Sequence, residues 1–467
     1  MRIELAEPMN AVLMMAEGMQ ASLRCIGKPP CCLAGITNDS REVRPGDMFV
    51  ALCGSHQSGS AFLKQALQRG AAAIALSDVS VPLPGNYWLF TVKDTAAALL
   101  HAAAMRREKS CARVIAISGS AGKTTVKETI SAVLAADGSR VSKSVGNYNS
   151  TIGMPLSLLG MREADYFVSE LGINHPGEMA PMSVALHPHV SVLTNIGTAH
   201  LGNFRSMRVL TAEKLSIAAG QGEKDVLLLP GEVEVPQSMR LVPRILCVGM
   251  HEHADFRAVN ICMNEKGTRA DIMCKERVIK NLVWHVPGSI GVSVLAIAAA
   301  IGMLEGKSDE AIRRGLEAAK LAAPRMRLIS VGTRSFLDDT YNASPEAVKA
   351  AIESARLLAA RRPLVAVLGD MLELGELTVP LHNAAGAFAA AHGVRQIFAY
   401  GKYAAAIAEG ARTAGMPTSS VFCFEVGEEA ALVASLLSET PKDAFMLFKA
   451  SRKMALNEVL ENTRRGL

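Results

Sequence analysis

A glycine-rich loop behind a short apolar strand constrains the fold of this chain more than any other segment. The apolar run 114–117 predicts a buried strand, and Ser118-Gly119-Ser120-Ala121-Gly122-Lys123-Thr124-Thr125 leads from it into a helical segment. Glycines let backbone N–H groups curl around phosphate oxygens, and the helix N-terminus adds a positive partial charge. Lys123 can reach the β- and γ-phosphates of a nucleotide, and the Thr124 hydroxyl can bind magnesium. The segment therefore predicts a nucleotide site; a turn that merely links strand and helix is the plain alternative.

Short apolar runs alternate with helical segments along most of the chain. Such alternation predicts parallel sheets covered by helices on both faces. A length of 467 residues suggests about three domains. We place the boundaries near the polar stretch 106–113 and at 322–324, which gives domains 1–108, 109–322 and 323–467. Strands are predicted at 47–52, 72–76, 114–117, 166–170, 190–194, 364–368, 396–400 and 444–448, and helices at 61–71, 211–219 and 290–304.

Composition excludes several classes of protein. The formal charge of +5 is modest, and no basic block is interleaved with aromatic residues, so nucleic acid is not an expected partner. The nine cysteines are dispersed without metal-binding spacing, which indicates reduced thiols in the cytoplasm. The longest apolar run, 290–304, is too short to span a membrane, and the first residues do not resemble a signal peptide. We expect a soluble, cytoplasmic protein, and a monomer.

The glycine-rich loop also departs from the common phosphate loop, because Ile117 occupies the position of its first glycine. The shortened form, Ser/Thr-Gly-x-x-Gly-Lys-Thr-Thr, resembles that of the Mur ligase family. Further segments resemble motifs of this family in the same order along the chain. They are 37–41 and 44–52 near the start, 147–155, 170–178 and 195–201 in the middle, and 324–326, 338–345, 368–375 and 449–452 in the last third.

The resemblance implies an α/β fold of three domains. An N-terminal uridine-nucleotide-binding α/β domain would precede a central P-loop ATPase with a mostly parallel sheet and a C-terminal Rossmann-like α/β domain. Such ligases use ATP to phosphorylate a substrate carboxylate, and an amine then attacks the acyl phosphate. Segments 338–345 and 368–375 resemble the branch that joins D-alanyl-D-alanine to a UDP-linked muramoyl tripeptide in peptidoglycan synthesis, which implies these two small-molecule substrates, ATP and two magnesium ions.

The resemblance also assigns roles to individual residues. It implies catalytic roles for Lys123, Glu170, His200 and Lys214, with Lys214 carbamylated by carbon dioxide. Magnesium would be bound by Thr124, Glu170 and His200. The nucleotide would be bound by Gly119, Ser120, Ala121, Gly122, Lys123, Thr124, Thr125, Arg325 and Asp339. The other substrates would be bound by Asp39, Ser40, Arg41, Asn147, Asn149, Asn174, His175, Asn342, Lys449, Ser451 and Arg452. For Glu170, His200 and Lys214 the plain alternatives are a solvated carboxylate, a loop histidine and an exposed helix lysine.

Several positions differ from the family pattern. Ile290, Gly291 and Val294 stand where polar residues of the family meet the nucleotide base, so we expect weaker discrimination between ATP and GTP. Lys214-Leu215-Ser216 replaces Lys-Gly-Glu, Ser150 replaces an asparagine, and 56–60 departs from Phe-Asp-Gly-His. Two alternatives therefore stay open. One is a relative that joins a different carboxylate to a different amine, and the other is a nucleotide-binding module without catalysis.

Overall fold

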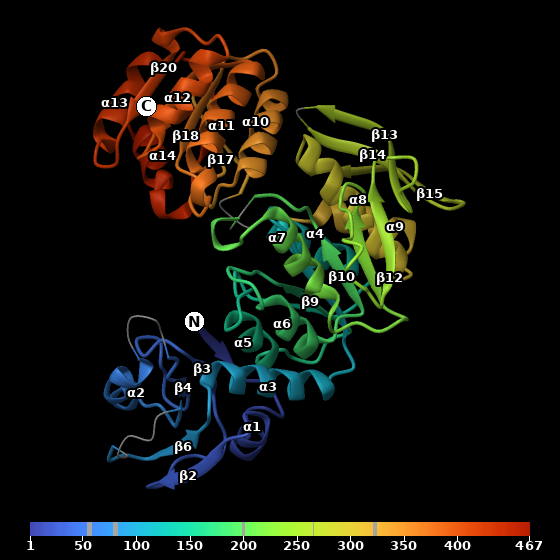
Figure 1. Ribbon diagram of the computed structural model, residues 1–467, viewed down its shortest axis with the longest axis vertical. Helices are drawn as coiled ribbons and strands as arrows, with labels where there is room; N and C mark the ends of the chain where they lie inside the picture. Colours follow the sequence, from blue (N-terminus) through green and yellow to red (C-terminus); the bar gives the residue numbers. More distant parts are fainter. Residues whose placement is uncertain (54–57, 78–82, 199–200, 265, 321–324) are drawn as a thin grey trace.

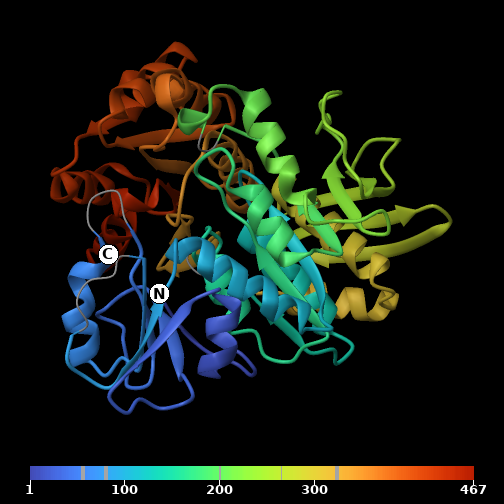
Figure 2. The same cartoon turned by 60° about the horizontal axis from the view of Figure 1, so that its bottom comes forward.

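Three α/β units follow one another along the chain, each built on its own sheet (Figure 1). The computed structural model describes residues 1–53, 58–77, 83–198, 201–264, 266–320 and 325–467. Figure 1 shows the middle domain placed between the first and the C-terminal domain, and Figure 2 shows the same arrangement from another side. The predicted three-domain α/β fold is confirmed.

The first domain has a sheet of order β1-β3-β4-β5-β6-β2 among its described residues. Strands β3 to β6 are parallel, and the edge strands β1 and β2 run antiparallel to their neighbours. The predicted strands at 47–52 and 72–76 appear as β4 and β5, while the helix expected at 61–71 is divided between η1 and α2. The elements are β1 (Arg2–Glu4), α1 (Val12–Gly18), β2 (Ser22–Ile26), β3 (Gly35–Thr37), β4 (Met48–Val50), η1 (Gly59–Phe62), α2 (Leu63–Gln68), β5 (Ala73–Leu76), β6 (Tyr87–Thr91) and α3 (Thr95–Glu108).

The middle domain has a sheet of order β15-β14-β13-β12-β11-β10-β7-β9-β8 in the described part of the chain. Every pair of neighbouring strands from β8 at one edge to β13 is parallel. Strands β14 and β15 extend the sheet with antiparallel pairing. The elements are β7 (Arg113–Ser118), α4 (Lys123–Ala135), β8 (Val141–Lys143), α5 (Gly153–Leu159), β9 (Tyr166–Glu170), α6 (Met179–Leu186), β10 (Val190–Leu193), η2 (Leu201–Asn203), α7 (Met207–Leu215), η3 (Ser216–Ala218), β11 (Val226–Pro230), β12 (Arg244–Gly249), β13 (Phe256–Asn264), β14 (Gly267–Cys274), β15 (Arg277–Trp284), α8 (Ser289–Leu304) and α9 (Asp309–Ala318).

The C-terminal domain has a sheet of order β16-β17-β21-β18-β19-β20 among its described residues. Neighbouring strands of this sheet pair in parallel, except that β16 and β17 pair antiparallel. The elements are β16 (Arg327–Val331), β17 (Arg334–Asp338), α10 (Pro345–Ala359), β18 (Leu364–Gly369), η4 (Gly375–Leu377), α11 (Thr378–Ala391), β19 (Val394–Tyr400), α12 (Ala404–Thr413), η5 (Thr418–Ser420), β20 (Val421–Phe424), α13 (Glu429–Glu439), β21 (Phe445–Lys449), η6 (Arg452–Met454) and α14 (Leu456–Arg465).

Helix α3 joins the first domain to the middle domain through one continuous core. Leu99 of α3 is fully buried in the same apolar cluster as Leu159 of α5 and Met182 of α6. At the end of α3, Arg106 Nη2 donates to Met161 O at 2.6 Å and Arg107 Nε donates to Leu186 O at 2.9 Å. The stretch that looked polar in the sequence therefore begins as a buried helix end, because both guanidinium groups bond to backbone carbonyls of the middle domain.

The C-terminal domain keeps its own apolar clusters and meets the middle domain through polar contacts and through Met326, which packs against a cluster of each domain. Ser354 Oγ of α10 donates to Pro287 O at 2.8 Å, and Ser289 Oγ of α8 donates to Glu353 Oε2 at 2.6 Å. Residues 322–324, where we placed the second boundary, lie outside the described residues, so that boundary stays a prediction. Within the described residues, no helix combines the length and apolarity that crossing a membrane requires.

Candidate active site

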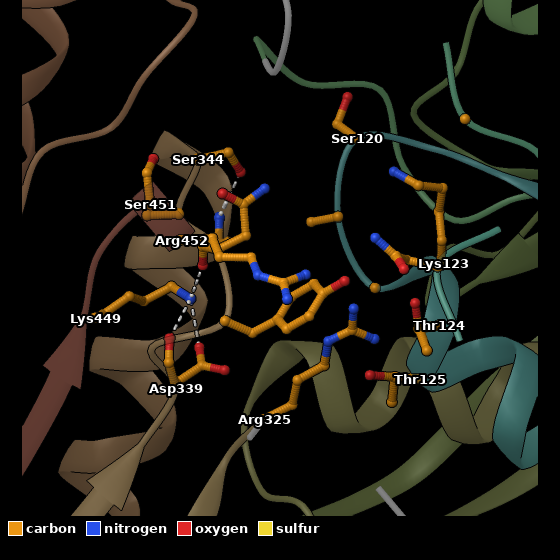
Figure 3. A pocket seen from close by; sticks show the side chains of 18 of the residues that line it. Ser120, Lys123, Thr124, Thr125, Arg325, Asp339, Ser344, Lys449, Ser451 and Arg452 are labelled. Carbon is orange, nitrogen blue, oxygen red and sulfur yellow. Dashed lines mark hydrogen bonds and ion pairs between the residues drawn. The ribbon is translucent and has the colours of Figure 1, made fainter. Parts of the chain in front are cut away.

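A cavity of about 590 Å³ lies between the middle and C-terminal domains. The phosphate loop forms one wall, and residues at the carboxyl ends of β17 and β21 form the opposite wall (Figure 3). Ligands of open α/β sheets bind at such strand ends. Of the predicted site residues, the cavity is lined by Ser120, Ala121, Gly122, Lys123, Thr124, Thr125, Asn147, Asn149, Glu170, Asn174, Arg325, Asp339, Asn342, Lys449, Ser451 and Arg452.

The phosphate loop connects β7 to α4 in a conformation that two glycines permit. Gly119 has φ +144° and Gly122 has φ +79°, backbone angles that residues other than glycine rarely adopt. A Cβ at Gly119 would also lie 2.0 Å from Thr194 Oγ1. Asn195 holds the loop from outside, because its Oδ1 accepts from the backbone N–H groups of Ser120 at 3.0 Å and Ala121 at 2.9 Å.

Lys123 lies at the start of α4 and faces the cavity. Its Nζ donates to Gly119 O at 2.7 Å, within the phosphate loop itself. Burial lowers the pKa of Lys123 and the Arg325 guanidinium lowers it further, while the Glu170 carboxylate opposes both. Two cations therefore converge on the cavity from opposite domains, an arrangement that favours a polyanionic ligand.

Glu170 ends β9 and is 3% exposed. Its Oε2 accepts from Thr124 Oγ1 at 2.7 Å, and its Oε1 accepts from Asn149 Nδ2 at 2.7 Å. A carboxylate and a hydroxyl are the oxygen ligands that magnesium prefers, so these two residues fit a magnesium ion. The predicted third ligand, His200, lies outside the described residues. In the described part of the chain, no group of three or more His, Cys, Asp or Glu side chains is arranged to hold a metal.

Lys214 lies in α7 and is 1% exposed. Burial first, and then the Lys123 ammonium, lower the pKa of Lys214 to about 7, against an opposing contribution from the Glu346 carboxylate. The exposed helix lysine that served as its plain alternative is therefore wrong, since the side chain is buried near another lysine. The lowered pKa favours the neutral amine, which is the form that reacts with carbon dioxide.

The C-terminal wall is an ion-paired cluster. Lys449 Nζ donates to Asp339 Oδ2 and, at 2.9 Å, to Asn342 O. Asp339 Oδ1 accepts from Met326 N at 3.2 Å, so both carboxylate oxygens of this predicted nucleotide-binding residue already have partners. Ser451 Oγ accepts from Leu372 N at 3.0 Å.

Sequence reasoning missed Tyr341, although it lies inside the quoted segment 338–345. The guanidinium carbons of Arg325 and Arg452 lie 4.2 Å and 5.4 Å from the centroid of its ring. Cation–π contacts of this kind hold guanidinium groups in place. The ring of Tyr341 thus contacts both arginines at the cavity, where Figure 3 labels Arg325 and Arg452.

Lys127 was also missed. It follows Thr124 by one helical turn of α4, is fully buried, and donates from Nζ to Ser144 O at 2.9 Å and Gly146 O at 3.0 Å. These bonds fix the segment that leads to Asn147 and Asn149. The sequence offered one signal for this role, because Lys127 follows Thr124 by three residues and therefore lies on the same face of the helix.

The remaining predicted residues lie away from the cavity or at its edge. Asp39, Ser40 and Arg41 follow β3 in the first domain, where Arg41 makes a bidentate ion pair that holds the pKa of Asp39 at about 2. Ser40 Oγ donates to Gln65 Oε1 at 2.5 Å. His175 is exposed and is not among the lining residues, although its backbone N–H, like that of Asn174, donates to Glu178 Oε2.

Of the three residues expected at the nucleotide base, only Ile290 lines the cavity among the described residues. Val294 is 1% exposed within the core of the middle domain. Gly291 is buried, and a Cβ at this position would lie 2.1 Å from Val286 O. Of these three positions, Ile290 is therefore the one at which a changed side chain can contact a nucleotide base in this cavity.

Known proteins resemble this chain along almost its whole length. Family models match at residues 33–107 (Mur ligase family, catalytic domain), 117–302 (Mur ligase middle domain) and 324–452 (Mur ligase, glutamate ligase domain). The UDP-N-acetylmuramoyl-tripeptide--D-alanyl-D-alanine ligase of Bacillus subtilis is 34% identical over 433 residues, which are 92% of each protein.

Two solved structures are similar to this one. A crystal structure of MurF from Acinetobacter baumannii superposes with a TM-score of 0.85 at 28% identity and covers 97% of this chain and 98% of its own. The MurF ligase of Thermotoga maritima, solved in complex with ADP, superposes with a TM-score of 0.77 at 25% identity and covers 92% and 97%.

Proposed function

Because the chain belongs to the Mur ligase family, we propose that it is an ATP-dependent ligase that adds D-alanyl-D-alanine to UDP-N-acetylmuramoyl-tripeptide in peptidoglycan synthesis. One observation carries the proposal. The phosphate loop of the middle domain faces Arg325, Asp339 and Lys449 of the C-terminal domain across a single cavity. A ligase needs this arrangement, because it must bring a phosphorylated carboxylate and an amine from separate binding sites into contact.

The residues of the cavity supply charge and alignment for phosphoryl transfer. Lys123 and Arg325 provide positive charge where the polyphosphate would bind, and Thr124 and Glu170 would hold magnesium together with His200. Magnesium, when bound, neutralises charge that develops on the transferred phosphoryl group. Two magnesium ions are part of the proposal.

The two other substrates are assigned to separate sites. Asp39, Ser40 and Arg41 would bind the uridine nucleotide in the first domain, and Asn147, Asn149, Asn174 and His175 would lie along the peptide. The amine would be bordered by Asn342, Lys449, Ser451 and Arg452. Attack of its nitrogen on the acyl phosphate forms the amide and releases phosphate.

The ligase assignment is tested by incubating the chain with ATP, magnesium, the UDP-linked tripeptide and a panel of amines, with products identified by mass. We expect ADP, phosphate and the pentapeptide product, and phosphate release that requires both carboxylate and amine. A product from a different acid or amine would favour the alternative of a relative in another pathway. ATP hydrolysis with neither substrate, or nucleotide binding without any product, would contradict the proposal.

Lys214 is proposed to act as a carbamate. An ammonium beside magnesium would be repelled, whereas a carbamate would offer oxygen ligands. The buried, partly neutral amine supports this role. We expect Lys214→Ala and Lys214→Arg each to lower kcat by at least about 100-fold, the scale of one lost electrostatic contact in a transition state.

A small carboxylate added to Lys214→Ala should restore part of its activity, and Lys224→Ala, at an exposed position of the same domain, serves as the control. Full activity of Lys214→Arg, in which charge is kept but carbamylation is impossible, would contradict the carbamate.

A further inference from the structure

The loop after β10 forms part of the wall behind the phosphate loop. Gly197 N donates to Ser120 Oγ at 2.7 Å, and Ser120 Oγ donates to Gly197 O at 3.0 Å. Asn195 of the same loop holds the backbone N–H groups of Ser120 and Ala121. Residues 195–198 are therefore joined to the phosphate loop by hydrogen bonds to Ser120 and Ala121.

Glu346 reaches this loop from the other domain. It lies in the first turn of α10, where the helix N-terminus favours a carboxylate. Its Oε1 accepts from Thr198 N at 2.8 Å and from Thr198 Oγ1 at 3.0 Å. The approach depends on glycine at 197, because a Cβ there would lie 2.3 Å from Glu346 Cδ.

The second carboxylate oxygen of Glu346 is buried and has no hydrogen-bond partner among the described residues. Buried carboxylate oxygens without a partner are uncommon, since their desolvation is costly. The cost of placing this group here indicates that the contact serves more than the stability of the fold. Its charge also acts on Lys214, which places the carboxylate within the electrostatic field of the candidate active site.

A second contact joins the C-terminal domain to η2, which lies C-terminal to this loop in the sequence. Gly202 N donates to Glu373 O at 3.2 Å, and a Cβ at Gly202 would lie 2.8 Å from Gly375 N. The two backbones approach this closely because both residues are glycines. The C-terminal domain thus forms hydrogen bonds with the middle domain at Thr198 and again at Gly202.

We propose that Glu346 is a positioning residue for ligation, an assignment that rests on the proposed function. Through Thr198 and Gly197 it fixes the C-terminal domain, which carries the amine site, relative to Ser120 of the phosphate loop. The reacting carbonyl and amine belong to different domains, so their alignment depends on this contact. Small misplacements of reacting groups lower rates steeply without changing how tightly each substrate binds alone.

Glu353 provides a matched control on the same helix. It also crosses to the middle domain, where its Oε2 accepts from Ser289 Oγ at 2.6 Å, but that contact lies on α8 rather than beside the phosphate loop. The experiment compares the full chain with Glu346→Ala, Glu346→Gln and Glu353→Ala. Gln keeps an oxygen that can accept from Thr198 N, whereas Ala removes the contact.

The first readout is hydrogen–deuterium exchange of the ligand-free protein, which needs no substrate. Glu346→Ala should accelerate exchange at the amides of Gly197 and Thr198 by about tenfold, because each 1.4 kcal/mol of lost protection is a factor of ten. Glu353→Ala should leave these amides within twofold of the parent. Equal acceleration in both alanine variants, or none in either, would overturn the assignment.

The second readout is kinetic. Glu346→Ala should lower kcat/KM for D-alanyl-D-alanine by about tenfold while the Kd for ATP stays within about twofold, and Glu346→Gln should recover most of the loss. A Kd for ATP that rises as much as kcat/KM falls would overturn the positioning role. A parent chain that forms no amide would overturn the ligase function itself, whereas an active parent with an unimpaired Glu346→Ala variant would overturn only the assignment of Glu346.

Discussion

The first domain joins the middle domain through a shared apolar core, whereas the C-terminal domain meets it through polar contacts around a cavity. Leu99 of α3 shares its cluster with residues of α5 and α6. The buried residues of the C-terminal clusters all belong to that domain, and only the half-buried Met326, among the described residues, packs against a cluster of each domain. Apolar cores are close-packed and resist displacement, and hydrogen bonds at a surface exchange readily with water. The chemistry is proposed at the interface that can rearrange.

The buried basic side chains near the two interfaces also differ, because those near the first keep their proton and the one near the second can lose it. Arg106 and Arg107 donate to backbone carbonyls, and although burial lowers the pKa of both, arginine remains protonated in proteins. Lys214, near the second interface, has its pKa lowered to about 7 and can lose its proton. A fixed charge serves structure, whereas a titratable one can serve a reaction.

The largest effect is expected at the shared core. Leu99→Ala should lower the free energy of unfolding by about 2–5 kcal/mol, because it opens a cavity among fully buried side chains. Urea denaturation followed at Trp88 of the first domain and at Trp284 of the middle domain, each in a variant with the other tryptophan replaced, should show both domains destabilised together.

Leu13→Ala, at a side chain that is 73% exposed, should change the free energy of unfolding by less than about 0.5 kcal/mol. Destabilisation seen at Trp88 alone would break the comparison, because it would mean that the two domains unfold independently.

Lys214 should make stability depend on pH. Its folded-state pKa of about 7 lies below the ordinary value of 10.5, so between these values the unfolded chain binds more protons and the free energy of unfolding rises with pH. From pH 7 to pH 9 the gain attributable to this group is about 2 kcal/mol. Urea denaturation in CO2-free buffer should show the gain in the parent and its loss in Lys214→Met.

Lys224→Met, at an exposed lysine, should keep the pH dependence of the parent. A parent and a Lys214→Met variant with the same dependence would remove the contrast between the arginines and Lys214.

The preference for ATP over GTP tests the cavity between the middle and C-terminal domains through the nucleotide that it would bind. With Ile290 as the one residue of the expected base segment that lines the cavity, kcat/KM for ATP should exceed that for GTP by less than about tenfold, because a lost base hydrogen bond forfeits on the order of 1–3 kcal/mol. Steady-state kinetics with both nucleotides measures the ratio. Ile290→Asn should raise it, and a strong ATP preference in the parent would show that other groups read the base.

The smallest effect is expected at a single bond between α10 and the middle domain. Ser354→Ala removes the donor to Pro287 O and should cost about 1 kcal/mol of unfolding free energy. The same denaturation experiment measures it, with Ser438→Ala at an exposed position as the control. A loss as large as that of Leu99→Ala would mean that the polar interface is as cohesive as the core.

The sequence predicted elements whose patterns are local. The strand 166–170 matches β9, the apolar run 290–304 matches α8 within one residue, and the phosphate loop lies between β7 and α4. These follow from hydrophobic runs and from glycine chemistry, which depend on neighbouring residues alone. The α/β class and the family were therefore accessible before any coordinates.

Contacts between distant segments were not accessible. Nothing near Arg106 signals that its guanidinium group reaches Met161 O, and the Thr198–Glu346 contact joins residues 148 positions apart. The burial of Lys214 depends in the same way on elements packed around α7. Residue roles carried over from the family, such as those of Asp39 and Lys449, stay predictions until they are tested with ligands.

Asn195 has a consequence for how fast and with what heat a nucleotide binds. Because its side chain already satisfies the amides of Ser120 and Ala121, the phosphate loop is shaped during folding, before a nucleotide arrives. Binding to a preformed loop avoids the entropy of ordering a flexible segment. Calorimetry should therefore show a heat-capacity change that reflects only the surface that the nucleotide covers, and association should proceed in one kinetic phase without a slow loop-ordering step.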